Sequence, residues 1–214
     1  MAAPSSSRSP PPPPPRPWPD WVRRGLFESV LIVFSVFLAL ALDGWREDGQ
    51  TRRRIAEVRR YFVEEIQANR AQLASPDFAP LHRRAASAWD GISRLPEPTA
   101  ADREKAWAVT PNGLHPFKGR DAVWRSFGSS NLIEHMPSRQ VFALAEVYQA
   151  QEALDGHNAA LLAVVRETSG DDEAPAYIRS QSKVVRGTLM DITYAEARLL
   201  ELYDKALREL GPRS

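Results

Sequence analysis

The first hydrophobic pattern in the chain is an uninterrupted apolar run near its beginning. Residues 30–42 read VLIVFSVFLALAL and carry no charge. From Leu26 to Leu42 the run predicts a helix of about 25 Å at ~1.5 Å per residue, slightly shorter than the ~30 Å hydrocarbon core of a bilayer. We therefore predict a transmembrane helix at 21–45. The alternative is a core helix buried inside a soluble protein.

Aromatic and basic residues flank this run in the way that membrane interfaces favour. Tryptophan is suited to the level of the lipid headgroups, and arginine side chains can extend from the apolar region to reach them. The predicted membrane-interface residues are Trp18, Trp21, Arg23, Arg24 and Trp45.

The same segment has some features of an export signal. Ala39-Leu40-Ala41 has the small-x-small spacing of a cleavage site, and Arg23-Arg24 resembles a twin-arginine signal. Glu28 interrupts the apolar region, however, and the helical pattern continues through the supposed cleavage site. We predict an uncleaved anchor, with a removable signal as the alternative.

A long amphipathic helix follows the span and extends to Leu73. Apolar residues recur every three or four positions, with Asn69 in register, as on one face of a helix. The stripe consists of Ile55, Val58, Phe62, Ile66 and Leu73. Arginines near the beginning of this helix are candidates for contacting anionic lipid, or belong to a solvated face: Arg52, Arg53, Arg54, Arg59 and Arg60.

Shorter elements occupy the middle of the chain. We predict helices at 77–95, at 101–109 with Thr99 or Asp102 as cap, and at 122–127, followed by a turn at 128–131. Between them, 110–120 reads TPNGLHPFKGR and predicts a long irregular loop. Loops of this length often carry function.

Two long helices complete the pattern. The first covers 138–168, with Asp155-Gly156 as a weak point and inward residues Val141, Leu144, Tyr148, Leu161, Leu162 and Val165. The second covers 176–210 and ends at Gly211-Pro212, and its apolar stripe is interrupted only at Glu196. No alternating strand pattern is found. The predicted fold is all-α: a transmembrane helix continuing into a juxtamembrane helix that joins an antiparallel helical bundle at 46–212.

Composition narrows the function classes. Of the 18 prolines, nine lie in residues 1–20, which predicts a disordered tail or, alternatively, a docking segment for a proline-binding module. The chain contains no cysteine, which excludes disulfides, thiol catalysis and thiolate metal sites. A net charge of +1 gives no general attraction to nucleic acid.

Searching for catalytic motifs gives no candidate. The histidines His82, His115, His135 and His157 are isolated in sequence, and no nucleophile or phosphate-binding motif occurs. The cluster 128–131 is interpreted as helix-capping turn chemistry. Trp89, Trp107 and Trp124 are interpreted as core or bundle-edge residues, with an aromatic ligand cage as the alternative. We expect no catalytic residue, cofactor or metal.

Two blocks of sequence resemble an uncharacterised bacterial family of single-pass membrane proteins. The first is 27–47, where an apolar span ends in Asp43-Gly44-Trp45-Arg46-Glu47, and the second is 122–133, AVWRSFGSSNLI. Gly128 precedes the serines here instead of directly preceding Asn131, which departs from the family pattern. The resemblance implies the architecture of a span with a helical domain and implies no activity.

These observations lead to a functional expectation. We predict a membrane-anchored interaction or sensing module in a bacterial inner membrane, with a lipid bilayer, an unidentified protein and a second copy of the chain as partners. Ser35 and Ala39 have the spacing of a helix-packing motif. Arginine counts favour a cytoplasmic domain, whereas a short tail before a signal-like helix favours an extracytoplasmic one, towards which we lean. The alternatives are an enzyme with a site near 110–131 and a tether acting through the proline-rich tail.

Overall fold

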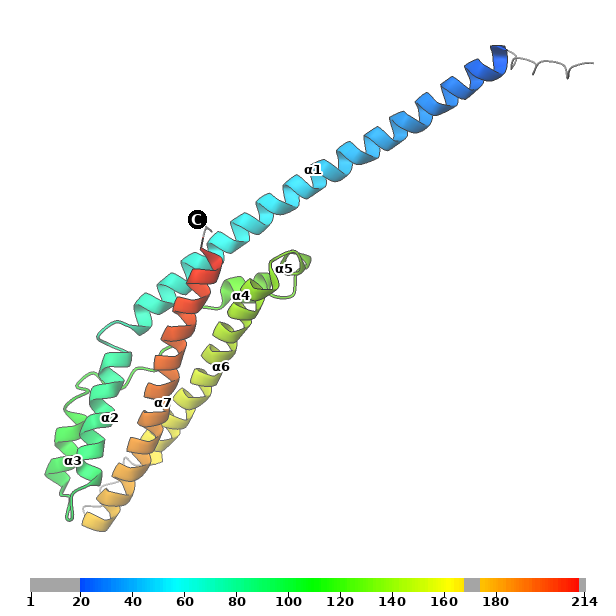
Figure 1. Ribbon diagram of the computed structural model, residues 1–214. Helices are drawn as coiled ribbons and strands as arrows, with labels where there is room; N and C mark the ends of the chain where they lie inside the picture. Colours follow the sequence, from blue (N-terminus) through cyan, green and yellow to red (C-terminus); the bar gives the residue numbers. More distant parts are fainter. Residues whose placement is uncertain (1–19, 168–173, 212–214) are drawn as a thin grey trace, which may run out of the picture. The chain divides into compact units, whose positions relative to one another are not determined.

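Every regular element in the described part of the chain is an α-helix. A computed structural model describes residues 20–167 and 174–211, and these residues form seven α-helices and no strand (Figure 1). The all-α prediction is confirmed. The chain divides into two compact units, Met1–Gln50 and Thr51–Ser214. The tail was predicted at 1–20. Its residues 1–19, which include Trp18, lie outside the described residues, and Asp20 begins the first helix.

The first unit contains the apolar part of α1 (Asp20–Leu73). An 18-residue window of this helix has a mean hydropathy of 2.0, and none of it is buried by the described chain. Its hydroxyl groups donate back to the helix itself, Ser29 to the carbonyl of Gly25 (2.9 Å) and Ser35 to that of Leu31 (2.7 Å). Such internal pairing suits a medium without water. The helix is therefore long and apolar enough to cross a membrane, and no described residue of this chain buries its apolar window as a core helix would be buried.

The later part of α1, from Thr51, belongs to the second unit and packs into its core. The predicted stripe is confirmed at Val58, Phe62, Ile66 and Leu73, which are all buried. Asn69 is also buried, at 0% exposure, although it is polar. An amide in this position requires hydrogen-bond partners.

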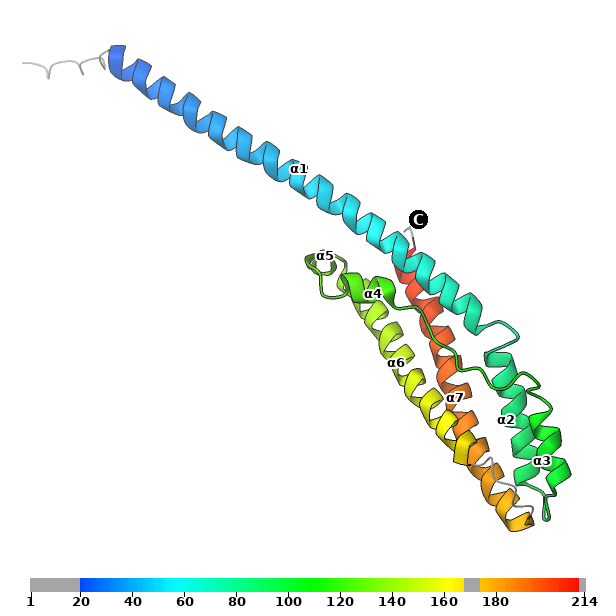
Figure 2. The same cartoon turned by 180° about the vertical axis from the view of Figure 1, so that it is seen from behind.

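The central element of the second unit is α7 (Pro175–Leu210), which lies between α6 (Ser138–Glu167) and α2 (Ala79–Ser93) (Figures 1 and 2). Early residues of α6 meet late residues of α7: the Gln140 amide donates to the carbonyl of Glu209 (2.8 Å). Farther along α6, Lys205 of α7 donates to Glu146 (2.6 Å). The two helices are therefore antiparallel, as predicted.

The stripe predicted along α7 is the core of this bundle. All of its members are buried: Val185, Leu189, Ile192, Leu199, Tyr203, Ala206 and Leu210. On α6, Leu144, Tyr148 and Leu161 are buried as predicted, whereas the prediction for Leu162 was wrong, since its side chain is 40% exposed. Leu162 follows Leu161 by one residue, a rotation of about 100° that turns it off the buried face. The α-helix continues through Gly156.

Helix boundaries differ slightly from the predictions. α2 begins at Ala79 instead of 77, with Pro80 in its first turn, where no backbone donor is needed. α3 (Ala100–Trp107) has Thr99 as N-cap, and Thr99 and Asp102 form a reciprocal capping box.

The turn predicted at 128–131 needs a correction. α4 (Ala122–Phe127) has the predicted bounds, but Asn131 begins a further helix, α5 (Asn131–Glu134). The Ser130 hydroxyl donates to the carbonyl of Phe127 (2.7 Å) and does not cap α5, so the side-chain capping predicted there was wrong at this residue. The N–H of Ser130 donates to the same carbonyl (2.9 Å), so backbone and side chain together close the turn.

The polar residue that interrupts the α7 stripe is paired inside the core. His82 of α2 and Glu196 of α7 share a hydrogen bond of 2.6 Å between Nδ1 and Oε1. Both side chains are buried, with 0% and 1% exposure. His82 is isolated in sequence but not in space, and Glu196 is a core residue. The pair fixes the alignment of α2 along α7, because any shift would leave both groups unpaired.

Substituting one or both members of the His82–Glu196 pair tests how much their hydrogen bond contributes to the stability of the bundle. We expect Glu196→Leu and His82→Leu each to lower the free energy of unfolding by roughly 2–4 kcal/mol, because each leaves one buried group unpaired. The double variant should lose less than the sum, because it leaves neither group alone. Urea unfolding of the full chain in detergent, followed by circular dichroism, measures this. Strictly additive losses would contradict the coupling.

Candidate functional site

The long loop after α3 is held against the bundle by amide side chains. Asn69 of α1 donates from Nδ2 to the carbonyl of Arg120 (2.8 Å), and the N–H of Arg120 donates to Asn69 Oδ1 (2.8 Å). The side-chain amide thus pairs with a peptide unit as another backbone segment would. This pairing explains why Asn69 occupies a core position of the α1 stripe.

A second amide fixes the preceding part of the loop. Asn158 of α6 donates to the carbonyl of Phe117 (2.9 Å). The Phe117 ring is 1% exposed and meets Phe78 edge-to-face, with centroids 5.7 Å apart. The loop is irregular, as predicted, but it is anchored from both α1 and α6.

A buried carboxylate positions the helix that follows the loop. Glu65 of α1 is 8% exposed and accepts a hydrogen bond from the Tyr148 hydroxyl (2.7 Å) and another from the N–H of Val123 (3.1 Å). Burial raises the pKa of Tyr148, and the adjacent Glu65 carboxylate raises it further, so the phenol remains protonated as a donor. Through Glu65, α1 holds both the start of α4 and a side chain of α6.

Aromatic rings complete this connection. Trp124 of α4 stacks on Tyr148, with centroids 5.0 Å apart and planes inclined by 14°. Phe62 of α1 contacts both rings, at 6.4 Å from Trp124 and 6.3 Å from Tyr148. The three rings form a rigid cluster next to the Glu65 hydrogen bonds.

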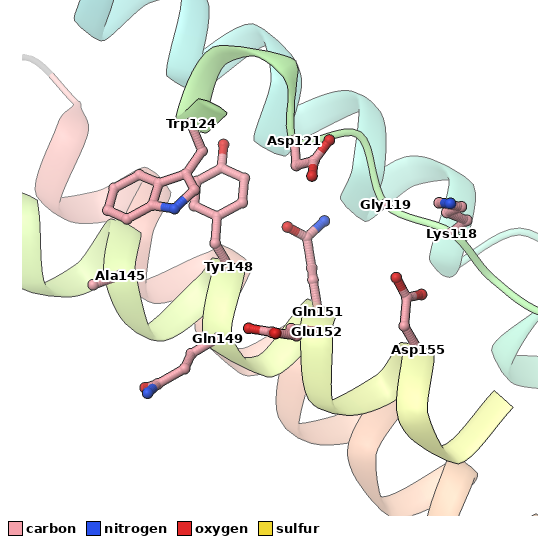
Figure 3. A pocket seen from close by; sticks show the side chains of 10 residues that line it. All are labelled: Lys118, Gly119, Asp121, Trp124, Ala145, Tyr148, Gln149, Gln151, Glu152 and Asp155. Carbon is pink, nitrogen blue, oxygen red and sulfur yellow. The ribbon is translucent and has the colours of Figure 1, made fainter. Parts of the chain in front are cut away.

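The anchored loop and α6 enclose a cleft of about 480 Å³ (Figure 3). This volume lies within the range of small-molecule sites, roughly 300–1,000 Å³. Three carboxylates and one ammonium group border it, together with the aromatic stack and two amides. The lining residues are Lys118, Gly119, Asp121, Trp124, Ala145, Tyr148, Gln149, Gln151, Glu152 and Asp155.

Gln151 occupies the middle of the cleft, between α6 and the loop (Figure 3). Its Nε2 donates to the Tyr203 hydroxyl (3.0 Å) and lies 3.5 Å from the carbonyl of Arg120. The opposite amide orientation would place two carbonyl oxygens against each other, so the nitrogen faces Arg120. Its Oε1 has no partner in the described chain, although the residue is only 7% exposed.

Gly119 lets the loop approach this amide closely. A Cβ added there would lie 1.8 Å from Gln151 Nε2 and 2.7 Å from Gln151 Cδ. A larger residue would displace the Gln151 side chain from its hydrogen bonds. The absence of a side chain at 119 is therefore part of the construction of the cleft.

The carboxylates of the cleft influence one another. The pKa of Asp155 is raised above its ordinary value, chiefly because nearby protein partly desolvates the carboxyl. Lys118 opposes this rise, whereas the negative charges of Asp121 and Glu152 add to it. The cleft therefore concentrates negative charge that a bound cation would neutralise.

The predicted membrane-interface residues lie on α1. Trp21 and Trp45 are 76% and 80% exposed, as expected of side chains free to meet lipid. Arg23 and Arg24 are within the helix, but their side chains fall outside the described part of the structure.

The candidate lipid-contacting arginines are mostly exposed. Arg52, Arg53, Arg54 and Arg60 are exposed, and Arg59 is half-buried. Arg60 pairs with Glu64 (3.6 Å), while Arg52 and Arg59 border a hollow of about 290 Å³. Both interpretations of this helix face, lipid contact and a solvated surface, fit these positions.

The enzyme alternative is not supported by the described residues. His115, Ser129 and Asn131 are all exposed, and no observed interaction joins them. Across 20–167 and 174–211, no group of three or more His, Asp or Glu residues could hold a metal. Trp89 is buried and packs edge-to-face on Trp107 with centroids 5.0 Å apart, in agreement with a core role.

Chemically, the cleft is arranged for binding. It presents carboxylates, a free amide oxygen and aromatic surface, but no nucleophile paired with a base. Comparison with models of protein families, with curated proteins and with solved structures finds no match to this chain.

Sequence reasoning missed most of the cleft. Tyr148 was identified as inward, but Gln151 and Glu152 were not singled out, and Asp155 was noted only as part of a weak point. The sequence did contain a signal for the cleft. The buried face of α6 is interrupted by three amides, those of Gln140, Gln151 and Asn158. Polar residues on a buried face indicate a specific partner.

The raised pKa of Asp155 gives a pH-dependent prediction. Because folding disfavours the ionised carboxyl, Asp155 destabilises the folded state when charged and loses this effect as pH falls below its raised pKa. We expect Asp155→Asn to raise the thermal unfolding midpoint at pH 7, with a gain that disappears below about pH 4. Differential scanning calorimetry across this pH range measures it. Asp191→Asn, on the exposed surface of α7, is the control, and a gain that persisted unchanged at low pH would contradict the argument.

Proposed function

We propose that this protein is a membrane-anchored sensing module in which occupancy of the cleft between the 118–124 segment and α6 is communicated to α1. The observation that carries the proposal is that α1 itself supplies the groups that hold the wall of the cleft. Glu65 binds Val123 and Tyr148, and Asn69 binds Arg120. A ligand that moves the wall must act on these hydrogen bonds.

The chain offers a direct covalent route from these residues to the apolar segment. Glu65, Asn69 and the apolar window belong to one helix, Asp20–Leu73. A continuous helix is a suitable carrier when a binding site biases one of two arrangements. Gly44 and Gly49 have open space around them and are the places where the helix could bend with least obstruction.

The apolar segment supports anchorage in a bacterial inner membrane as a single span. Trp21 and Trp45 would lie at the two interfaces, and the arginines at 52–60 would contact anionic headgroups or solvent. The resemblance to a bacterial single-pass family agrees with this arrangement. An association of two copies through Ser35 and Ala39 would provide an oligomeric output.

Topology is the first element to test. We propose that the helical domain is extracytoplasmic, although the arginine count by itself favours the cytoplasm. Alkaline phosphatase fused to the carboxyl end should be active, and a fluorescent protein fused there should be dark. The reverse result would place the domain in the cytoplasm and direct the search for ligands there.

Communication from the cleft to α1 can be tested without knowing the ligand. Because the chain contains no cysteine, a single cysteine at Ala56, exposed on α1, accepts one nitroxide label. In nanodiscs, Asn69→Ala releases the Arg120 segment, and we expect it to change the mobility of the label as measured by electron paramagnetic resonance. Asn112→Ala, at an exposed position of the same loop, should not.

Two outcomes would contradict the sensing role. One is an unchanged spectrum in a folded Asn69→Ala variant. The other is an equal change in both variants, which would indicate a general effect of loop mutations. Circular dichroism of the labelled proteins establishes that each variant is folded.

A further inference from the structure

The cleft bordered by Asp121, Gln151 and Asp155 presents hydrogen-bond acceptors in excess of donors. Three carboxylates, those of Asp121, Glu152 and Asp155, face one ammonium group, that of Lys118. Asp121 also pairs with Arg125 outside the cleft (2.9 Å). Glu152 and Asp155 have no ion pair within 4.0 Å in the described chain. Glu152 and Asp155 are exposed, and Lys118 offsets only part of the negative charge of the three carboxylates. The remaining negative charge attracts cations and repels anions.

A second, independent feature points in the same direction. Gln151 lines the same cleft, and its Oε1 is buried and has no hydrogen-bond partner in the described chain. A buried acceptor without a donor costs roughly 1–3 kcal/mol. The hydrogen bond to Tyr203 and the close approach of Gly119 fix the amide, so this oxygen cannot turn away to find another donor. A ligand with an N–H group satisfies it.

The aromatic wall adds a surface for the non-polar part of such a ligand. Trp124 and Tyr148 both line the cleft, and their stacking holds them in place. Electron-rich aromatic faces attract ammonium and guanidinium groups, with tryptophan the most effective. A site with carboxylates on one side and aromatic rings on the other recognises an amine attached to a short carbon chain.

We propose that this cleft binds a small organic cation with N–H donors, a diamine or guanidinium compound, whose cationic group lies between the Glu152 and Asp155 carboxylates and donates to Gln151 Oε1. This inference rests on the proposed function, because it names the ligand class of the same cleft. A bare metal ion fits less well, since no metal-holding group of His, Asp and Glu is found across the described chain. An anion would meet the carboxylates, and an apolar ligand would leave the Gln151 oxygen unpaired.

The test uses the full chain in nanodiscs and isothermal titration calorimetry. The probes are putrescine and agmatine, with 1,4-butanediol as the uncharged analogue of the same length and Ca²⁺ as the metal. We expect saturable binding of at least one cation that weakens with added salt, and no measurable binding of the diol. The double variant Glu152→Gln/Asp155→Asn should bind at least tenfold more weakly, because charge-assisted hydrogen bonds are lost.

A matched double variant serves as control. Glu134→Gln/Asp191→Asn removes the same charge from exposed positions outside the cleft and should change the Kd less than about twofold. Gln151→Met, which retains an unbranched side chain without the amide, should weaken agmatine and putrescine binding about tenfold. Thermal unfolding of each variant separates loss of the site from loss of the fold.

Several results would overturn the inference. They are binding of both cations weaker than about 10 mM, equal losses in the two double variants, diol binding as tight as diamine binding, and tight Ca²⁺ binding that excludes the amines. Failure of the sensing role is distinguishable from these. Cation binding that leaves the label at position 56 unchanged would sustain the site and reject communication. If the label responds to Asn69→Ala but no cation binds, communication from the cleft wall to α1 is retained and the cation site is rejected.

Discussion

Polar groups buried in a helical core require hydrogen-bond partners, and this requirement determines how the second unit is assembled. Asn69, Glu65 and Asn158 occupy positions on helix faces that are otherwise apolar. Each finds its partner in the segment 117–123, which is irregular up to Asp121 and then begins the first turn of α4. The irregular loop and the polar core residues therefore satisfy each other, and neither would be stable without the other.

The same requirement aligns the helices. The His82–Glu196 pair joins α2 to α7, and the Gln140 amide joins α6 to the last turn of α7. Hydrophobic stripes alone allow sliding by one turn, since an apolar residue packs well against many neighbours. A buried hydrogen-bonded pair such as His82–Glu196 is satisfied in only one alignment of the two helices. Burial of apolar side chains stabilises the bundle, and a few polar contacts determine the alignment of its helices.

Hydrogen bonding is incomplete at several buried atoms, Asn158 Oδ1 among them, and one of these atoms belongs to a residue that lines the cleft. Gln151 retains a free oxygen beside carboxylates that Lys118 offsets only in part, in contrast to Asn69, whose amide is fully engaged with Arg120. The unpaired group lies between two segments held by α1. Sites of function commonly sacrifice local stability in this way, and the raised pKa of Asp155 is one expression of that cost.

The sequence by itself determined the all-α class, the apolar run, the stripe from Val58 to Leu73 and the full length of α7, because these depend on periodicity along one helix. It also indicated a loop at 110–120. Only the tertiary structure decided that His82 meets Glu196 and that the carboxylates of 121, 152 and 155 share one cleft with Gln151. These contacts join residues distant in sequence. Their partners are selected by helix alignment in three dimensions, which no local pattern encodes.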